Sequence, residues 1–200
     1  MTPLALDHLM RRGFVSVAAI IPVSFVGGDA GQYQVVRMHT VVGEPLAPVR
    51  AVASQPQHLT VRDVPGSAWV LRGTSTHLRY VQNDELERLR AVQPALGRQN
   101  CTHAALIPIR KNDAWWDLPQ DERRAIFEQR SQHIASTLEY LPAIARRLHH
   151  SRELGEPFDF LTWFEYAPEH AELFEELVEM LRLTEEWKYV EREVDIRLVK

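Results

Sequence analysis

The segment Trp115–His150, WWDLPQDERRAIFEQRSQHIASTLEYLPAIARRLHH, joins a long helical pattern directly to a strand pattern, and it decides the fold of the C-terminal half. In a helix predicted over 118–141, apolar residues and one histidine recur at spacings of three, four or seven, which gathers them on one face. They are Ile126, His133, Ile134, Leu138 and Leu141. Pro142 cannot continue a helix and marks the end of this one. His133 is therefore expected to point inward.

The strand predicted over 144–150 carries an arginine among apolar residues. Alternation places Ile144, Arg146 and Leu148 on one face, with Arg147 on the other. A buried guanidinium stays charged and needs an anion or a ligand, and no acid lies beside Arg146 in the sequence. Two ordinary alternatives stay open. The inward histidine can be a hydrogen-bonded core residue, and the arginine can extend to solvent or pair with a distant acid.

From residue 103 onward the predicted elements follow the order β-α-β-β-α-β. They are strand 103–109, helix 118–141, strand 144–150, strand 158–166, a helix from Pro168 and strand 188–199. This order is typical of a ferredoxin-like plait, an α+β fold with an antiparallel sheet. Before it, strands are predicted at 14–25, 34–42 and 68–81, with one short helix at 84–93. We therefore predict two domains, a ferredoxin-like half at 98–200 and a degenerate related half at 1–97.

Composition excludes several classes of protein. The chain has 200 residues, 45% of them hydrophobic and 25% charged, which is ordinary for a soluble globular protein. With a net charge of −4 and no basic block longer than two residues, no nucleic-acid partner is expected. No apolar run is long enough to span a membrane. A single cysteine, Cys101, rules out an internal disulfide and fits a cytoplasmic protein.

The first residues superficially resemble a secretory signal. Arg11 and Arg12 precede the apolar run GFVSVAAIIPVSFVGG, but no clear cleavage site ends this run. We interpret it as a strand of a cytoplasmic protein.

Most chemical motifs are missing from the sequence. None of the common signatures of serine hydrolases, nucleotide-binding loops or zinc proteases occurs. The side chains of His149 and His150 point to opposite faces of a strand, so this pair is expected at the surface and not on one metal ion. Trp115–Trp116 is typical of core or interface packing. Glu185 and Glu186 lie near the end of the last helix, where a carboxylate opposes the helix dipole and needs a partner.

Four stretches together resemble the chlorite dismutase family of haem proteins, and specifically its short lineage. They are WWDLPQDERR, HIASTLEYLPAIARRLHHSREL, PFDFLTWFEYAPEH and LRLTEEWKYV, starting at residues 115, 133, 157 and 181. The resemblance runs from about Leu78 to the C-terminus. It implies a haem b enzyme that converts chlorite to chloride and O2, with O–O bond formation at ferric haem iron. It also implies a homodimer.

The same resemblance assigns roles to individual residues. It makes His133 the proximal ligand of the haem iron and Arg146, thirteen residues later, the distal residue. A glutamate near the end of the last helix then accepts the N–H of the proximal histidine. Glu186 matches the family pattern L-x-L-x-x-E, which starts here at Leu181, whereas extending the apolar stripe of the helix favours Glu185.

Four further residues follow from the resemblance. Trp115 and Trp116 correspond to tryptophans beside the haem, and Gln93 corresponds to a distal glutamine next to the arginine. Tyr80 is expected to contact a haem propionate. Where many members carry a tryptophan, this chain has Leu106.

Two other functions stay open at this point. The chain could be a haem-binding protein of haem metabolism, similar to the coprohaem decarboxylases, or a peroxidase whose chlorite activity is incidental. The decarboxylases carry a catalytic tyrosine near position 106 and usually lack the distal arginine, so Leu106 and Arg146 argue against that activity. The other possibility is a dimerising plait without a cofactor, which would lack the Soret band of a haem protein.

Overall fold

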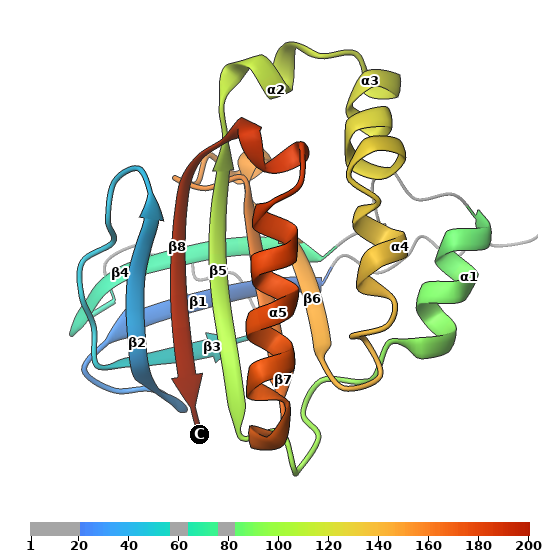
Figure 1. The fold of residues 1–200 in the computed structure, drawn as a ribbon. Coiled ribbons are helices and arrows are strands. Elements are labelled where there is room, and N and C mark those ends of the chain that lie inside the picture. The colour runs from blue at the N-terminus through green and yellow to red at the C-terminus, as the bar shows by residue number, and fades with distance from the viewer. Residues whose placement is uncertain (1–20, 57–63, 76–82) are drawn as a thin grey trace, which may run out of the picture.

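The computed structural model describes residues 21–56, 64–75 and 83–200. In these parts of the chain, antiparallel strands close into a barrel in the order β1-β3-β2-β8-β5-β7-β6-β4 (Figure 1). The strands are β1 (Ile21–Gly28), β2 (Tyr33–Val42), β3 (Ala51–Gln55), β4 (Ser67–Ser75), β5 (His103–Lys111), β6 (Ala145–His150), β7 (Phe160–Tyr166) and β8 (Val190–Val199). The α-helices are α1 (Asn83–Val92), α2 (Asp113–Asp117), α3 (Gln120–Arg124), α4 (His133–Thr137) and α5 (Ala171–Arg182).

The predicted ferredoxin-like plaits are wrong as the architecture of this chain. In a separate plait the two outer strands of the sheet would stay unpaired on one side. Here β8 pairs with β2, and the paired residues run from Gln34 opposite Val199 to Val42 opposite Glu193. Strand β6 pairs with β4, where His150 lies opposite Thr74. The N-terminal strands therefore belong to the same barrel and do not form a second plait. Closure of the barrel gives hydrogen-bond partners to the backbone groups of strands that would otherwise lie at a sheet edge. The pattern within one strand does not reveal which distant strand pairs with it, so the closure could not be predicted from that pattern.

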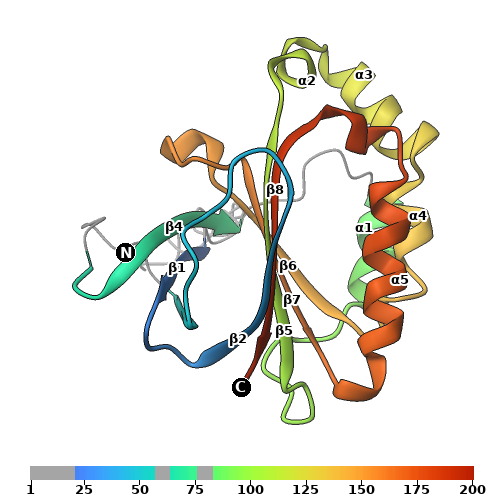
Figure 2. The same ribbon diagram turned by 60° about the vertical axis from the view of Figure 1, so that its left-hand side comes forward.

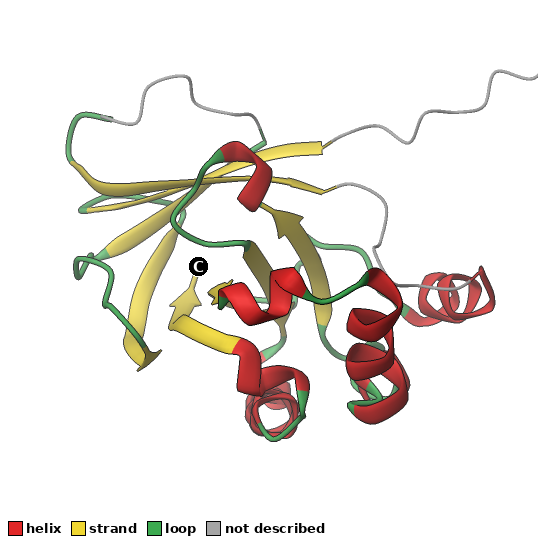
Figure 3. Cartoon of the chain, turned by 90° about the horizontal axis from the view of Figure 1, so that it is seen from above, coloured by secondary structure: helices red, strands yellow, loops and turns green. Residues whose placement is uncertain are grey.

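The two faces of the barrel wall pack against different parts of the structure, one against the barrel interior and the other against the helices. Along β7, Leu161 and Trp163 pack inside the barrel, whereas Phe164 and Tyr166 pack outside against Phe174 of α5, with ring centroids 5.0 and 4.5 Å away. Figure 2 shows α1, α4 and α5 on one side of this wall, with β1, β2 and β4 on the other. Seen from above in Figure 3, most of the helices gather on one side of the strands. The structure thus has an inner core and a second core under the helices.

Several predicted elements are confirmed within one to three residues, including the strands at 34–42, 103–109, 144–150, 158–166 and 188–199 and the helix at 84–93. The single helix predicted over 118–141 is wrong, because α3, a π-helical segment and α4 divide it. The strand predicted from residue 14 lies outside the described residues up to residue 20. None of the described helices is both long and apolar enough to cross a membrane.

The pairing of β1 with β4 depends on a glycine. The indole of Trp69 lies flat on Gly27, and its Nε1 donates a 3.0 Å hydrogen bond to the carbonyl of Ala47, which holds the ring in place. A methyl group at position 27 would lie only 2.1 Å from Cε2 of Trp69. The close contact of Gly27 and Trp69 therefore requires the absence of a side chain.

We expect Gly27→Ala to lower the free energy of unfolding by about 1–3 kcal/mol, because the indole of Trp69 must move and lose packing. Val36→Thr changes an exposed position of β2 and should alter stability by no more than about 0.5 kcal/mol. Urea denaturation of both variants checks this. Equal stability of the two variants would contradict the role assigned to Gly27.

Candidate functional site

The helix that carries His133 is interrupted immediately before that residue. Ala125–Arg130 forms a π-helical segment, and the N–H of Ser131 bonds to the carbonyl of Ile126, five residues earlier. Gln132 then adopts a left-handed conformation, with φ of 50°. Such a backbone is unfavourable for a residue with a side chain, and π-helical insertions are frequent at functional sites. The interruption separates α4, which starts at His133, from α3 and the π-helical segment.

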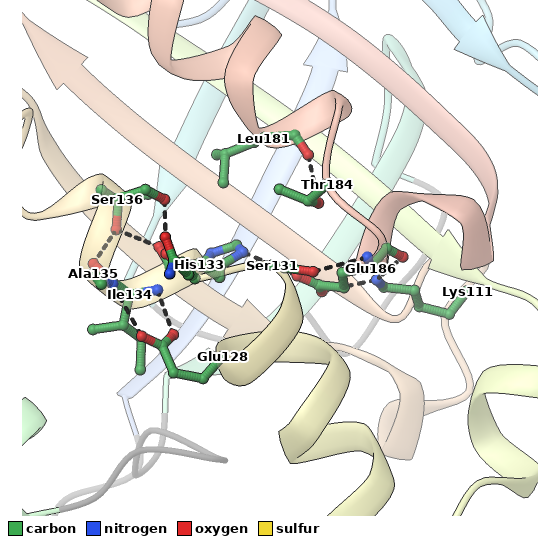
Figure 4. A network of polar contacts seen from close by, with 12 residues as sticks. Lys111, Glu128, Ser131, His133, Ile134, Ala135, Ser136, Leu181, Thr184 and Glu186 are labelled. Atoms are coloured by element: carbon green, nitrogen blue, oxygen red, sulfur yellow. Dashed lines mark hydrogen bonds and ion pairs between the residues drawn. The ribbon is translucent and has the colours of Figure 1, made fainter.

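Glu128 caps the new helix. Its carboxylate accepts hydrogen bonds from the backbone N–H groups of Ile134, at 2.7 Å, and Ala135, at 3.2 Å (Figure 4). These N–H groups have no partner within the helix, and the positive end of the helix dipole favours a carboxylate there. The cap fixes the first turn of α4 and, with it, the backbone of His133.

Behind His133 lies a buried network of charged groups. Oε2 of Glu186 is 3.0 Å from Nδ1 of His133, and Oε1 of Glu186 is 2.8 Å from Nζ of Lys111 (Figure 4). The backbone N–H of Glu186 also donates to Oγ of Ser131, at 3.0 Å. Glu185 lies elsewhere, where it pairs with Arg130 at 2.9 Å. Of the two candidate glutamates, only Glu186 contacts His133.

Glu186 and Lys111 each shift the pKa of the other. Burial by itself would raise the pKa of Glu186, but Lys111 and His133 outweigh this effect and lower that pKa to about 2. Burial lowers the pKa of Lys111, an effect that Glu186 opposes. Glu186 is therefore a carboxylate at neutral pH and can accept a hydrogen bond from Nδ1–H of His133. With Nδ1 as the donor, Nε2 of His133 is the ring nitrogen that could bind haem iron.

Arg146 lies on the face of β6 that faces the helices, and its charge is unpaired. Among the residues that the structure describes, no acid or hydrogen-bond acceptor contacts its guanidinium. Burial lowers the pKa of Arg146 to about 10, so it stays charged at neutral pH. Its backbone carbonyl accepts a 2.8 Å hydrogen bond from Nε2 of Gln93. The structure thus brings Gln93 and Arg146 together through the backbone, and it leaves the cation available to an anion.

Trp115 belongs to the network around Glu186. The Nζ of Lys111 lies 4.5 Å from the centre of its ring, and the ring of Tyr189 packs 5.4 Å away. Trp115 is buried, yet its Nε1 has no hydrogen-bond partner within the described parts of the chain. An orphaned donor in such a position fits a polar group of a cofactor.

Trp116 occupies a different place from its neighbour. Its Nε1 donates to Asp159 at 3.3 Å, the guanidinium of Arg152 lies 4.0 Å above its ring, and Phe160 stacks on it at 6.0 Å. It therefore packs at the start of β7, away from the contacts that hold Trp115. Tyr80 lies outside the described residues. Leu106 is fully buried inside the barrel.

Two residues that contact the site, and the burial of two histidines on β6, differ from what spacing in the sequence indicates. Lys111 and Asp159 were not predicted, although Lys111 directly continues the apolar pattern of β5, where a lysine can be buried beside a partner. The expected surface position of His149 and His150 is wrong, since they are only 3% and 5% exposed. The pairing of β6 between β7 and β4 covers them.

Lys111 and its neighbour Arg110 offer a matched test of the buried ion pair. We expect Lys111→Met to lower the free energy of unfolding by about 3–5 kcal/mol, because it leaves the charge of Glu186 buried without its lysine. Arg110→Met removes an exposed pair with Glu191 and should cost no more than about 1 kcal/mol. Urea denaturation measures both. Equal losses would contradict the assigned role of Lys111.

Comparison with known proteins identifies the family of the chain. Residues 34–199 match the family model described as chlorite dismutase. The chlorite dismutase of Ideonella dechloratans is 30% identical over 102 residues, which are 48% of this chain. The matched part spans only 33% of the length of that relative.

Solved structures are similar over most of the chain. The dimeric chlorite dismutases from Nitrobacter winogradskyi are 56% identical, with a TM-score of 0.83 over 89% of this chain and 99% of theirs. A mutant chlorite dismutase from Candidatus Nitrospira defluvii is 20% identical, with a TM-score of 0.66 over 90% of each chain, and it supports the fold alone. Because the family model covers most of the sequence, the chain belongs to the chlorite dismutase family.

Proposed function

We propose that this chain is a haem b enzyme that converts chlorite to chloride and O2. The reaction is balanced without any co-reactant, since the chlorine gains the electrons that the two oxygen atoms lose and no proton is consumed. The observation that carries the proposal is the hydrogen bond between His133 and the buried Glu186–Lys111 pair, together with the unpaired Arg146. The name of the Nitrobacter relative supports the choice of chlorite as substrate.

His133 would hold the haem iron through Nε2. When bound, haem supplies a redox-active iron that can exchange an oxygen atom with an oxyanion. Glu186 keeps the proton of His133 on Nδ1 and makes Nε2 a stronger donor, while Lys111 keeps Glu186 charged. Trp115 would lie beside the haem with its free Nε1. Roles for Trp116 and Tyr80 beside the haem rest on the family resemblance alone.

Arg146 would bind the substrate. A cation with low solvent access attracts a small anion more strongly than an exposed one, because less water screens the charge. Its N–H groups can also orient the oxygen atoms of chlorite. Gln93 acts as a positioning residue, because its amide holds the backbone of Arg146. No acid–base group is needed, since the overall reaction moves no proton.

We also propose that the chain forms a homodimer, since the Nitrobacter relative, which matches nearly the whole described fold, is described as dimeric. Size-exclusion chromatography with light scattering would measure the mass.

The function is tested by O2 evolution at an electrode after chlorite is added to the haem-loaded protein. We expect Arg146→Ala to lower turnover by about 10²–10³-fold, because a preorganised charged donor is lost. Arg110→Ala removes an exposed arginine of β5 and should leave turnover unchanged.

Wild-type turnover in Arg146→Ala would contradict the role of this residue. A haem-loaded wild-type protein that evolves no O2 would contradict the chlorite reaction itself and favour a role in haem metabolism or peroxide chemistry.

A further inference from the structure

A cavity of about 140 Å³ lies inside the barrel, on the side of β6 opposite to Arg146. Strand alternation separates the two sites, because Arg146 faces the helices while Arg147 and His149 face the interior. Most of the wall is apolar, with Ile21, Val23 and Leu96 among its residues. Its aromatic and polar members include Phe25, Tyr33, Arg147, His149, Trp163 and Glu165.

His149 is a buried polar side chain, one ring nitrogen of which has no hydrogen-bond partner in the described structure. It is 3% exposed, its ring packs edge-on against Phe25 at 5.7 Å, and its Nδ1 makes no hydrogen bond in the described structure. Burial, and then the charges of Arg147 and His150, lower the pKa of His149 to about 3. The ring is therefore neutral at neutral pH and offers one N–H donor. Buried polar atoms in native proteins nearly always bond to protein, water or a ligand.

Among the described residues of the cavity wall, Glu165 is the one acid, and its oxygens already have hydrogen-bond partners. Glu165 accepts hydrogen bonds from Nε1 of Trp163 at 3.0 Å, from the backbone N–H of Gly97 at 2.5 Å and from the hydroxyl of Tyr33 at 3.4 Å. Burial, followed by the charge of Glu165, raises the pKa of Tyr33 to about 12, which keeps this hydroxyl protonated as a donor.

Arg147, in contrast, has no ion pair or hydrogen bond from its guanidinium among the described residues. Glu165 lines the same cavity and keeps its own charge, but its oxygens bond to Trp163, Gly97 and Tyr33 and make no ion pair with Arg147. Two groups of the wall thus lack a hydrogen-bond partner among the described residues, the guanidinium of Arg147 and Nδ1 of His149, and both lie on β6.

We propose that this cavity binds a small organic monoanion, a carboxylate with a short apolar or aromatic body. The carboxylate would bond to Arg147 and His149, and the apolar body would pack on Phe25 and Trp163, whose stacked rings lie 5.3 Å apart. An apolar cavity of about 150 Å³ holds one benzene ring, so the volume suits a ligand of this size. Inorganic anions or water alone would leave the aromatic wall without contacts.

Isothermal titration calorimetry with benzoate as the probe and the full-length protein tests the proposal. We expect benzoate to bind the wild-type protein, and benzyl alcohol, which has nearly the same shape without the charge, to bind at least about tenfold more weakly. Arg147→Gln should weaken benzoate binding by about tenfold or more. The matched control Arg110→Gln removes an exposed arginine and should leave it unchanged.

A second variant addresses His149. His149→Leu keeps a similar volume and removes both ring nitrogens, so we expect it to lose benzoate binding while its melting temperature stays the same or rises.

Three results would overturn the proposal. They are no benzoate binding to the wild-type protein, equal binding of benzyl alcohol, and unchanged benzoate affinity in both Arg147→Gln and His149→Leu. None of these measurements depends on chlorite turnover, so their outcome is independent of the proposed function.

Discussion

A buried carboxylate shared between a histidine and a lysine joins the parts of the chain that form the candidate site. Glu186 connects three segments that are distant in the sequence, namely the end of β5 through Lys111, the start of α4 through His133, and the turn after α5. Burying charged groups costs free energy unless each has a close partner of opposite charge or a hydrogen bond. Misplacing any of these segments would leave a charge unpaired, so the network favours one arrangement of the helices on the barrel.

The barrel wall allows one strand to serve two chemical environments. Because side chains of a strand alternate between faces, neighbouring arginines on β6 point to opposite sides of the wall. Arg146 faces the helices and the proposed haem site, and Arg147 faces the interior cavity. The closed sheet keeps the two environments apart. A substitution at one of these positions can therefore change one site and leave the other intact.

Local patterns in the sequence predicted most strands, the inward direction of His133 and the position of Arg146, because these depend on spacing along a single element. The closure of the barrel was not predictable in this way, since the partners of β6 and β8 lie far away in the sequence. The interruption before His133 also escaped prediction, because Ser131 bonds to Glu186, a residue 55 positions later. Glu185 and Glu186 could not be distinguished by helical spacing, since α5 ends at Arg182 and the chain turns before Glu186.

The proposed function depends most on His133, which, supported by Glu186, would hold the haem iron. The most direct test of this role is a titration of the haem-free protein with haemin, followed by absorbance, in the wild type and in His133→Ala. The account predicts that the wild-type protein saturates with one haem per chain and a sharp Soret band, and that His133→Ala loses this band or shifts it and binds haemin more weakly. The same Soret band and the same affinity in His133→Ala would contradict the account.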